Sequence, residues 1–273
     1  MCIIQADFFS KVLMRRVPFM AILPTDRVVE GKYEEIPQNG YKTMYLIHGI
    51  TDDDTDWLTG TRIKFWAIER NLAVIMPSGD NSFYVDTPLG RDYGEYIGRE
   101  LVEQTRRMFP LSRKREDTFL AGQSMGGFGA LRNGLKYNNT FGSIVALSSA
   151  LHIFEPGYDH SSGDSLGALL PFGDMDKACV SDKNPRVLVQ KLLQKKRQDP
   201  STPIPKIYMD CGRQDTLYAS NQTFLQYLRD NGIDVTYQDD DGVHGWEYWD
   251  KRMPYALDWL PLDEKADYIG KNN

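Results

Sequence analysis

Residues 119–131, which read Phe-Leu-Ala-Gly-Gln-Ser-Met-Gly-Gly-Phe-Gly-Ala-Leu, decide the fold of this chain. The first of these residues are apolar, as in a buried strand, and the last have the apolar spacing of a helix. Gly122 and Gly126 stand two residues before and two residues after Ser124, where small residues let the chain reverse sharply without clashes. The stretch therefore predicts a strand, a tight turn with a serine at its tip, and a helix.

The same turn has the composition of a nucleophile site. A serine at such a tip projects beyond the end of the strand, and the helix behind it directs N-terminal amides toward developing negative charge. The backbone amide of Met125 is the expected first donor to an oxyanion. The alternative is a glycine-rich turn with a purely structural role, but the apolar strand before Ser124 and the apolar-spaced helix after it favour a nucleophile.

Strands and helices alternate through most of the rest of the chain. Two alternating stretches, 3–9 and 16–23, predict a pair of N-terminal antiparallel strands. Further strands are expected at residues 43–47, 72–76, 118–121, 143–147, 206–210 and 235–237. Helices are expected at residues 60–70, 92–109, 125–137, 185–194, 221–229 and 246–259. This order predicts an α/β protein of the α/β-hydrolase fold, with a mostly parallel central sheet and helices on both faces.

Residues 1–273 are predicted to form a single α/β-hydrolase domain. One segment, 150–184, has no clear place in the alternation and is rich in Gly, Ser, Asp and Pro. It falls between a strand and a helix, where loops over active sites are common. We therefore expect a loop or cap insertion there and no second domain.

A serine hydroxyl needs a base, and in this fold the order along the chain is serine, acid, histidine. His244 lies between the last expected strand and the last expected helix, where the base belongs. His160 is the alternative, but no strand is expected near it. His48 precedes the serine, and we expect it to hold its own loop by a hydrogen bond.

Two aspartates are candidates for the acid that orients the histidine. Asp210 ends an expected strand, whereas Asp215 lies in the loop after it and can reach a histidine from the side. Asp215 could instead cap the following helix. We favour Asp215, which would fix the imidazole tautomer and stabilise the imidazolium ion.

The remaining site residues are expected in loops that follow strands. The stretch 45–50 ends with a glycine and Ile50, and we expect the Ile50 amide to be the second oxyanion donor. Four side chains are candidates for the substrate-binding pocket, with a position in the core as the alternative for the aromatic ones: Trp57, Tyr84, Asp86 and Phe154.

Composition excludes several other classes of protein. The formal net charge of −6 argues against non-specific nucleic-acid binding and gives no attraction to anionic membranes. No stretch approaches 18 apolar residues and no signal peptide is recognisable, so a cytoplasmic protein is expected. The three cysteines, Cys2, Cys179 and Cys211, form no disulfide or metal-ligand pattern. The acidic run at 52–56 lacks the ligand spacing of a calcium loop and is interpreted as a solvated loop.

At this point the sequence resembles the putative esterases related to tributyrin esterase and S-formylglutathione hydrolase, close to the feruloyl and acetyl-xylan esterases. The tributyrin-esterase branch is nearer than the thioesterase branch. The matching segments span nearly the whole chain: Arg16–Phe19, Tyr45–Gly49, Asp56–Trp57, Met76–Pro77, Tyr84–Thr87, Gly122–Gly127, Cys211–Gly212 with Asp215, and His244 before Trp246–Glu247.

The resemblance implies hydrolysis of short acyl esters without a cofactor. It implies Ser124, Asp215 and His244 as the catalytic residues, with the amides of Ile50 and Met125 as the oxyanion hole. Acetylated or feruloylated oligosaccharides and simple short-chain esters are equally compatible substrates. The alternatives are a thioesterase, a peptidase, or a non-catalytic binding protein on the same fold. A homo-oligomer is compatible with the sequence, which carries no signal for or against it.

Overall fold

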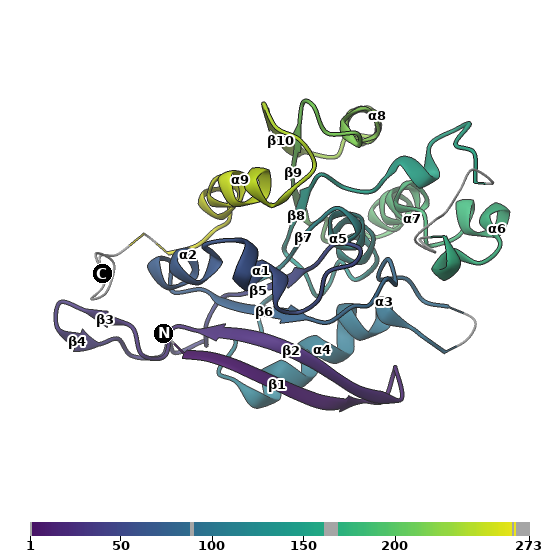
Figure 1. The fold of residues 1–273 in the computed structure, drawn as a ribbon. Helices are drawn as coiled ribbons and strands as arrows, with labels where there is room; N and C mark the ends of the chain where they lie inside the picture. Colours follow the sequence, from purple (N-terminus) through teal and green to yellow (C-terminus); the bar gives the residue numbers. More distant parts are fainter. Residues whose placement is uncertain (1, 88–89, 161–168, 264, 266–273) are drawn as a thin grey trace.

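The structure, a computed structural model, describes residues 2–87, 90–160, 169–263 and 265. Its centre is an eight-stranded sheet with the order β1-β2-β6-β5-β7-β8-β9-β10 (Figure 1). The strands are β1 (Cys2–Ser10), β2 (Arg15–Leu23), β5 (Thr43–Ile47), β6 (Ala73–Pro77), β7 (Thr118–Gln123), β8 (Ser143–Leu147), β9 (Lys206–Gly212) and β10 (Val235–Asp240).

The sheet is antiparallel at one side and parallel elsewhere. β1 and β2 pair antiparallel from Cys2↔Leu23 to Ser10↔Arg15, and β2 pairs antiparallel with β6. From β6 to β10 all neighbours are parallel. The predicted N-terminal strand pair and mostly parallel sheet are confirmed, and the carboxyl ends of the parallel strands meet at one edge, where α/β proteins carry their sites.

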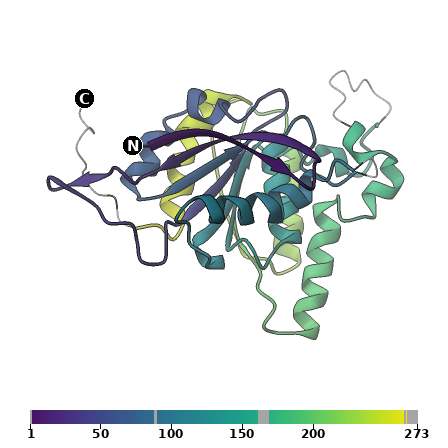
Figure 2. The same cartoon turned by 90° about the horizontal axis from the view of Figure 1, so that it is seen from below.

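Helices cover both faces, as predicted (Figure 2). On one face lie α1 (Asp56–Gly60), α2 (Ile63–Glu69) and α9 (Trp246–Trp259). On the other lie α3 (Tyr93–Glu95), the π-helical turn η1 (Tyr96–Glu100), α4 (Leu101–Met108), α5 (Met125–Lys136), α7 (Pro185–Gln198) and α8 (Tyr218–Asp230). Strand β5 serves both layers, because its side chains alternate: Met44 and Leu46 pack in one core cluster, Tyr45 and Ile47 in the other.

Three local predictions needed correction. The helix expected at 60–70 is the shorter α2, and a separate helix, α1, ends at Gly60 because the backbone of Thr61 is extended. The helix expected at 92–109 contains the π turn η1, where Gly98 lies so close to Tyr137 that a Cβ would sit 2.1 Å from the ring. A short hairpin that was not expected, β3 (Val28–Val29) and β4 (Lys32–Tyr33), lies between β2 and β5.

The segment 150–184 carries only short elements among its described residues: η3 (His152–Phe154), η4 (Leu170–Phe172) and α6 (Met175–Cys179). A further turn, η2 (Arg115–Asp117), precedes β7. Residues 161–168 of the predicted insertion lie outside the described residues. Across the part of the chain that is described, no helix is both long and apolar enough to span a membrane.

Candidate active site

Ser124 stands at the turn between β7 and α5, in a backbone conformation rare for residues other than glycine (φ 56°, ψ −118°). Its N–H donates to the Leu147 carbonyl at 2.9 Å, and its carbonyl accepts the N–H groups of Phe128 and Ala150 at 3.0 Å. Such a conformation costs free energy and persists where surrounding bonds hold it. The turn is tight because a Cβ on Gly122 would lie 2.5 Å from the Gly126 backbone.

Three side chains that are far apart in the sequence converge at this turn. The Ser124 hydroxyl lies 3.0 Å from Nε2 of His244, and Nδ1 of the same ring lies 2.8 Å from Oδ2 of Asp215. His244 follows β10, and Asp215 follows β9, so both reach the serine from the carboxyl edge of the sheet. His160, the alternative base, instead contacts the Ile153 carbonyl at 2.9 Å.

Asp215 is held as a carboxylate. Burial by itself would raise the pKa of Asp215, but hydrogen bonds from His244, the Leu217 amide and the Ser148 hydroxyl outweigh burial and keep that pKa below its usual value. The side chain is fully buried, whereas His244 is 31% exposed. A charged carboxylate behind a half-exposed imidazole can stabilise that ring when it takes a proton.

Asp210, the alternative acid, has other partners. Its carboxylate accepts hydrogen bonds from Arg252 Nε at 2.8 Å, from the Tyr208 hydroxyl at 3.1 Å and from the Tyr248 hydroxyl. All four side chains are buried or nearly so. The Asp210 cluster therefore ties β9 to α9 behind the site, and only Asp215 faces His244.

The loop that follows β5 packs directly on the start of α5. A Cβ on Gly126 would lie 2.4 Å from the Ile47 carbonyl oxygen and 2.7 Å from that of His48. Gln123 donates from Nε2 to Asp52 at 2.8 Å and so ties the same loop to the serine turn. Within the described part of the chain, the N–H groups of Ile50 and Met125 donate no hydrogen bond, so both amides are available for an oxyanion.

His48 holds this loop and is a neutral ring. Its Nε2 accepts the Gly79 N–H at 2.8 Å, and its Nδ1 lies 2.7 Å from the Gly49 carbonyl, to which it donates. Burial lowers the pKa of His48, in agreement with the acceptor role of Nε2. The ring thus fixes the loop by hydrogen bonds, as expected, and a role as a second base has no geometric support.

Two predicted substrate-binding side chains lie in the core instead. Trp57 is 1% exposed, donates from Nε1 to the Ile47 carbonyl at 3.0 Å and packs edge-on against Trp246. Tyr84 is fully buried and donates its hydroxyl to the His48 carbonyl at 2.9 Å. Assigning them to the pocket was wrong, because each supports the oxyanion loop from behind and leaves no ring face for a ligand.

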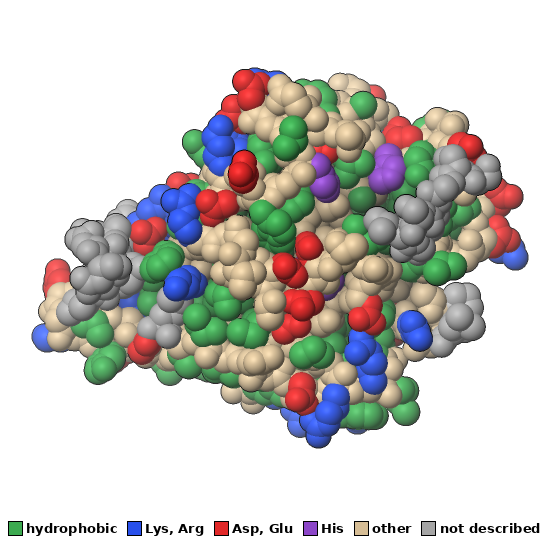
Figure 3. All heavy atoms as spheres, viewed as in Figure 1, with side chains coloured by type: hydrophobic (Ala, Val, Ile, Leu, Met, Phe, Trp, Pro, Cys, Tyr) green, Lys and Arg blue, Asp and Glu red, His purple; other side chains and the backbone are tan. Residues whose placement is uncertain are grey.

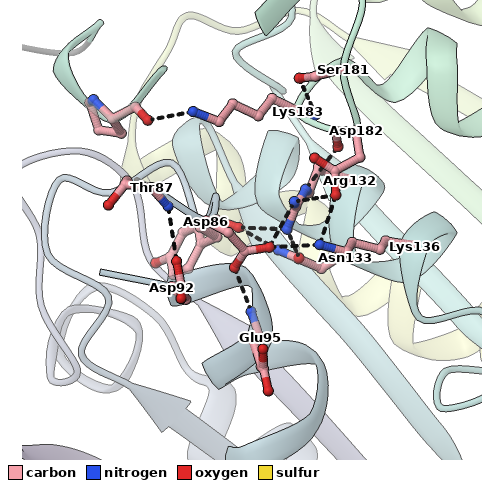
Figure 4. Close-up of polar contacts among 12 residues, drawn as sticks. Asp86, Thr87, Asp92, Glu95, Arg132, Asn133, Lys136, Ser181, Asp182 and Lys183 are labelled. Carbon is pink, nitrogen blue, oxygen red and sulfur yellow. Dashed lines mark hydrogen bonds and ion pairs between the residues drawn. The ribbon is translucent and has the colours of Figure 1, made fainter. Parts of the chain in front are cut away.

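Asp86 is also wrongly placed among the substrate contacts, because cations of α5 occupy it (Figure 4). Its carboxylate accepts from Arg132 at 3.1 Å, from Lys136 at 2.6 Å and from the Glu95 N–H at 2.8 Å. Asp182 pairs with the same two cations at 3.2 and 2.7 Å. This ion cluster, in which only the Arg132 side chain is fully buried, attaches the 150–184 segment to the helix that begins behind Ser124.

Phe154, the fourth candidate, packs against the helix that follows the serine turn. Its ring stacks on Phe128 at 5.8 Å and meets Phe172 edge-on at 5.4 Å. Phe128 lies one helical turn after Ser124, so the cluster of Phe128, Phe154 and Phe172 packs next to the serine turn. Phe154 is 8% exposed, and its contact with substrate remains a prediction.

Histidine side chains and acidic side chains come to the surface close together on the face of Figure 3. Among the acidic residues of the 52–56 loop, Asp53 accepts from the Thr55 N–H and hydroxyl at 2.7 Å, and Asp56 from the Asp53 N–H at 2.6 Å. Hydrogen bonds within the loop and to Gln123 therefore use the carboxylates of Asp52, Asp53 and Asp56, whereas Oδ2 of the buried Asp54 has no partner among the described residues. No cluster of three metal-ligating side chains occurs among residues that the structure describes.

Sequence reasoning missed two residues beside the site. Ser148, directly after β8, contacts Asp215, and Trp249 on α9 meets the His244 ring edge-on at 5.0 Å. The only available signal for Ser148 was its place at the end of a buried strand between those that lead to Ser124 and Asp215. Trp249 has the appearance of an ordinary core residue in the sequence.

A mixed sheet with a serine turn at its carboxyl edge and a histidine–carboxylate pair beside it defines the class of α/β-hydrolase enzymes. Comparisons with known proteins narrow the class. The chain is 42% identical over 266 residues to an acetyl esterase of Caldicellulosiruptor saccharolyticus, covering 95% of this chain and 98% of that one. Two solved Staphylococcus aureus structures, a fluorophosphonate-binding serine hydrolase F with substrate bound and an S-formylglutathione hydrolase, each match with a TM-score of 0.80 and 30% identity, over 95% of this chain and 98% of theirs.

The family model for putative esterases matches residues 10–260. The chain belongs to this family and is a carboxylic ester hydrolase, as the resemblance in the sequence indicated.

Proposed function

We propose that this esterase is a serine carboxylesterase that hydrolyses short-chain acyl esters, acetyl esters above all, through an acyl-enzyme on Ser124. The observation that carries the proposal is the continuous hydrogen-bonded row from the Ser124 hydroxyl through His244 to the Asp215 carboxylate, with distances of 3.0 and 2.8 Å. The 42% identity to a protein named acetyl esterase supports the acetyl preference.

In this mechanism His244 acts as the base. Its Nε2 takes the Ser124 proton as the hydroxyl oxygen attacks the ester carbonyl carbon. Asp215 accepts the Nδ1–H, keeps Nε2 free as an acceptor, and stabilises the imidazolium that forms. The imidazolium then gives its proton to the leaving alcohol, and water repeats both steps on the acyl-enzyme.

The negative oxygen of the tetrahedral intermediate needs donors that are already in place. We assign this role to the amides of Met125 and Ile50. Both are free of partners among the described residues, and the close contact of Gly126 with the β5 loop supports their proximity. The start of α5 adds the positive end of its dipole at the same point.

Replacing Ser124 with alanine tests this assignment. Turnover of p-nitrophenyl acetate is expected to fall by several orders of magnitude, because the nucleophile is lost while the binding surface remains. An organophosphate is expected to add its mass to Ser124 of the native enzyme and to leave the S124A variant unlabelled. An S124A enzyme that keeps most of its esterase activity would refute the proposal.

Substrate choice requires a separate measurement. We infer a preference for C2 over C8 acyl chains, with acetylated or feruloylated oligosaccharides as candidate natural esters. The second candidate is a thioesterase of the S-formylglutathione hydrolase type, which the 30% identity to such an enzyme supports. Values of kcat/KM on C2–C8 esters, acetyl-xylooligosaccharide and S-formylglutathione decide between them.

We also infer that residues 1–273 form one catalytic domain, with segment 150–184 as the cap of the substrate pocket. The contacts of Asp182 and Phe154 with α5 support this arrangement. A cytoplasmic location, the absence of nucleic-acid and membrane partners, and homo-oligomer formation remain predictions.

A further inference from the structure

Ser148 occupies a special position behind the proposed triad, and the inference drawn from it rests on the proposed function. It follows β8, which lies between β7, the strand of Ser124, and β9, the strand that leads to Asp215. Ser148 is fully buried and has a left-handed backbone (φ 45°), with its N–H donating to the Asp210 carbonyl at 2.8 Å. A conformation this unfavourable for serine is typical of functional positions.

The hydroxyl of Ser148 has three polar neighbours. The indole Nε1 of Trp249 lies 3.2 Å from Ser148 Oγ, and the Asp215 carboxylate and the Cys211 thiol are the other two. An indole N–H can only donate and a carboxylate can only accept, whereas a hydroxyl carries a single proton. The hydroxyl therefore accepts from Trp249, and its own proton is free for Asp215, whose carboxylate is a stronger acceptor than the neutral thiol.

Trp249 also contacts the other end of the acid–base pair. Its ring meets the His244 ring at 5.0 Å between centroids, with the planes perpendicular. These four residues therefore form a closed ring of contacts: Trp249 to Ser148, Ser148 to Asp215, Asp215 to His244, and His244 back to Trp249. The thiol of Cys211 lies beside Ser148 and Asp215, and burial raises its pKa, so it adds no charge.

We propose that Ser148 is a positioning residue of this esterase, whose hydroxyl links the Trp249 indole to the Asp215 carboxylate and fixes the acid against His244. Ser148 does not touch the reacting atoms. It limits the rotation of the Asp215 carboxyl group, whose Oδ1 accepts the Leu217 N–H at 2.8 Å and whose Oδ2 faces His244. Trp249 positions the imidazole and the Ser148 hydroxyl together.

Two pairs of matched variants test the proposal on short-chain ester hydrolysis. Ser148→Ala removes the linking hydroxyl, and Ser149→Ala removes a buried hydroxyl of the next residue that has no partner among the described residues. Trp249→Phe keeps a ring but loses the N–H, and Trp259→Phe loses an N–H on the same helix that binds Thr236 at 2.9 Å, away from the site.

S148A is expected to lower kcat about tenfold, the value of one hydrogen bond to a charged group, and to leave KM within about twofold. W249F is expected to lower kcat about threefold, and the double variant to be no slower than S148A, since both changes act through one hydroxyl. The downfield proton NMR signal of the His244 Nδ1–H is expected to move in S148A and W249F and to stay in place in both controls.

The proposal is overturned if kcat of S148A equals that of S149A, if only KM changes, or if the two losses multiply in the double variant. Thermal unfolding of each variant shows whether it is folded. If S148A does not fold, the proposal is tested by comparing kcat of W249F with kcat of W259F. Equal kcat values in these two variants overturn the proposal. S124A is assayed alongside: activity in S124A refutes the proposed nucleophile, whereas an inactive S124A with a normal S148A refutes only the role of Ser148.

Discussion

At the scale of single residues, the site depends on which of two neighbouring aspartates faces the histidine. Asp210 and Asp215 differ by five positions, and both are buried. Asp210 is surrounded by Arg252 and two tyrosine hydroxyls, whereas Asp215 lies 2.8 Å from the His244 ring. The sequence favoured Asp215 because a residue in the loop after the strand can reach a histidine from the side. In the structure, its carboxylate lies beside the His244 ring.

The same substitution at each aspartate distinguishes the proposed catalytic role of Asp215 from the structural role of Asp210. Asp215→Asn is expected to lower kcat by about three to four orders of magnitude, because an amide cannot stabilise imidazolium and favours the wrong tautomer, with only a small loss of stability. Asp210→Asn is expected to lower the free energy of unfolding by about 2–4 kcal/mol, since Arg252 loses its buried partner, and to change kcat of the folded fraction by less than about threefold. Urea unfolding and ester hydrolysis measure both. A D210N enzyme that folds normally but loses catalysis would reverse the assignment.

At the scale of elements, α5 begins directly after Ser124 and carries the attachment of the 150–184 segment. Ser124, Phe128, Arg132 and Lys136 recur every four residues and so share one face of the helix. Phe128 contacts Phe154 and Phe172, while Arg132 and Lys136 bind Asp86 and Asp182 (Figure 4). Periodicity predicted the helix, but nothing in the sequence identified Asp86 and Asp182 as the partners of Arg132.

A second set of contacts between elements joins the loop after β5 to His244. Trp57 on α1 meets Trp246 at 5.2 Å, and Trp246 meets Trp249 on α9 at 5.1 Å, each pair nearly perpendicular. Trp249 in turn meets His244. Three indoles therefore connect the end of β5 with His244, an arrangement that aromatic residues in two separate helices do not reveal in sequence.

The ion cluster on α5 gives a prediction at this scale. Arg132→Met is expected to destabilise the protein by about 3 kcal/mol, because the fully buried guanidinium of Arg132 balances two carboxylates that Lys136 alone would then have to neutralise. Arg99→Met, the same change at the exposed pair with Glu95, is expected to cost less than about 0.5 kcal/mol. Urea unfolding of both variants gives the comparison, and equal losses would contradict the buried role.

At the scale of the whole molecule, carboxylates held below their usual pKa make stability depend on acid. For Asp86 and Asp182, burial would raise the pKa, but Arg132 and Lys136 outweigh burial and lower it. For Asp215 the hydrogen bond from His244 has the largest opposing effect. A lowered folded pKa contributes stability above the unfolded value, about 3.9, and this contribution disappears as pH falls through the folded values.

The free energy of unfolding is therefore expected to fall most steeply below about pH 4. A shallower decline is expected to begin near pH 6.5, since buried His48 has a lowered pKa and must take up a proton on unfolding. Urea titrations from pH 7 to pH 3.5 at constant ionic strength measure this. The steep part is expected to be smaller in R132M than in R99M, and equal slopes in the two variants would contradict the assignment to the α5 cluster.

The sequence by itself determined the order of strands and helices, the serine turn and the convergence of Asp215 and His244 on Ser124. Those features depend on local periodicity, on small residues at a sharp turn and on chain order, all of which are written along the chain. Only the tertiary structure decided that Trp57 and Tyr84 are buried, that Asp86 pairs with Arg132 and Lys136, and that Ser148 and Trp249 lie beside Asp215 and His244. Contacts between residues far apart in the sequence depend on how the layers pack on the sheet, and no short stretch of sequence encodes that packing.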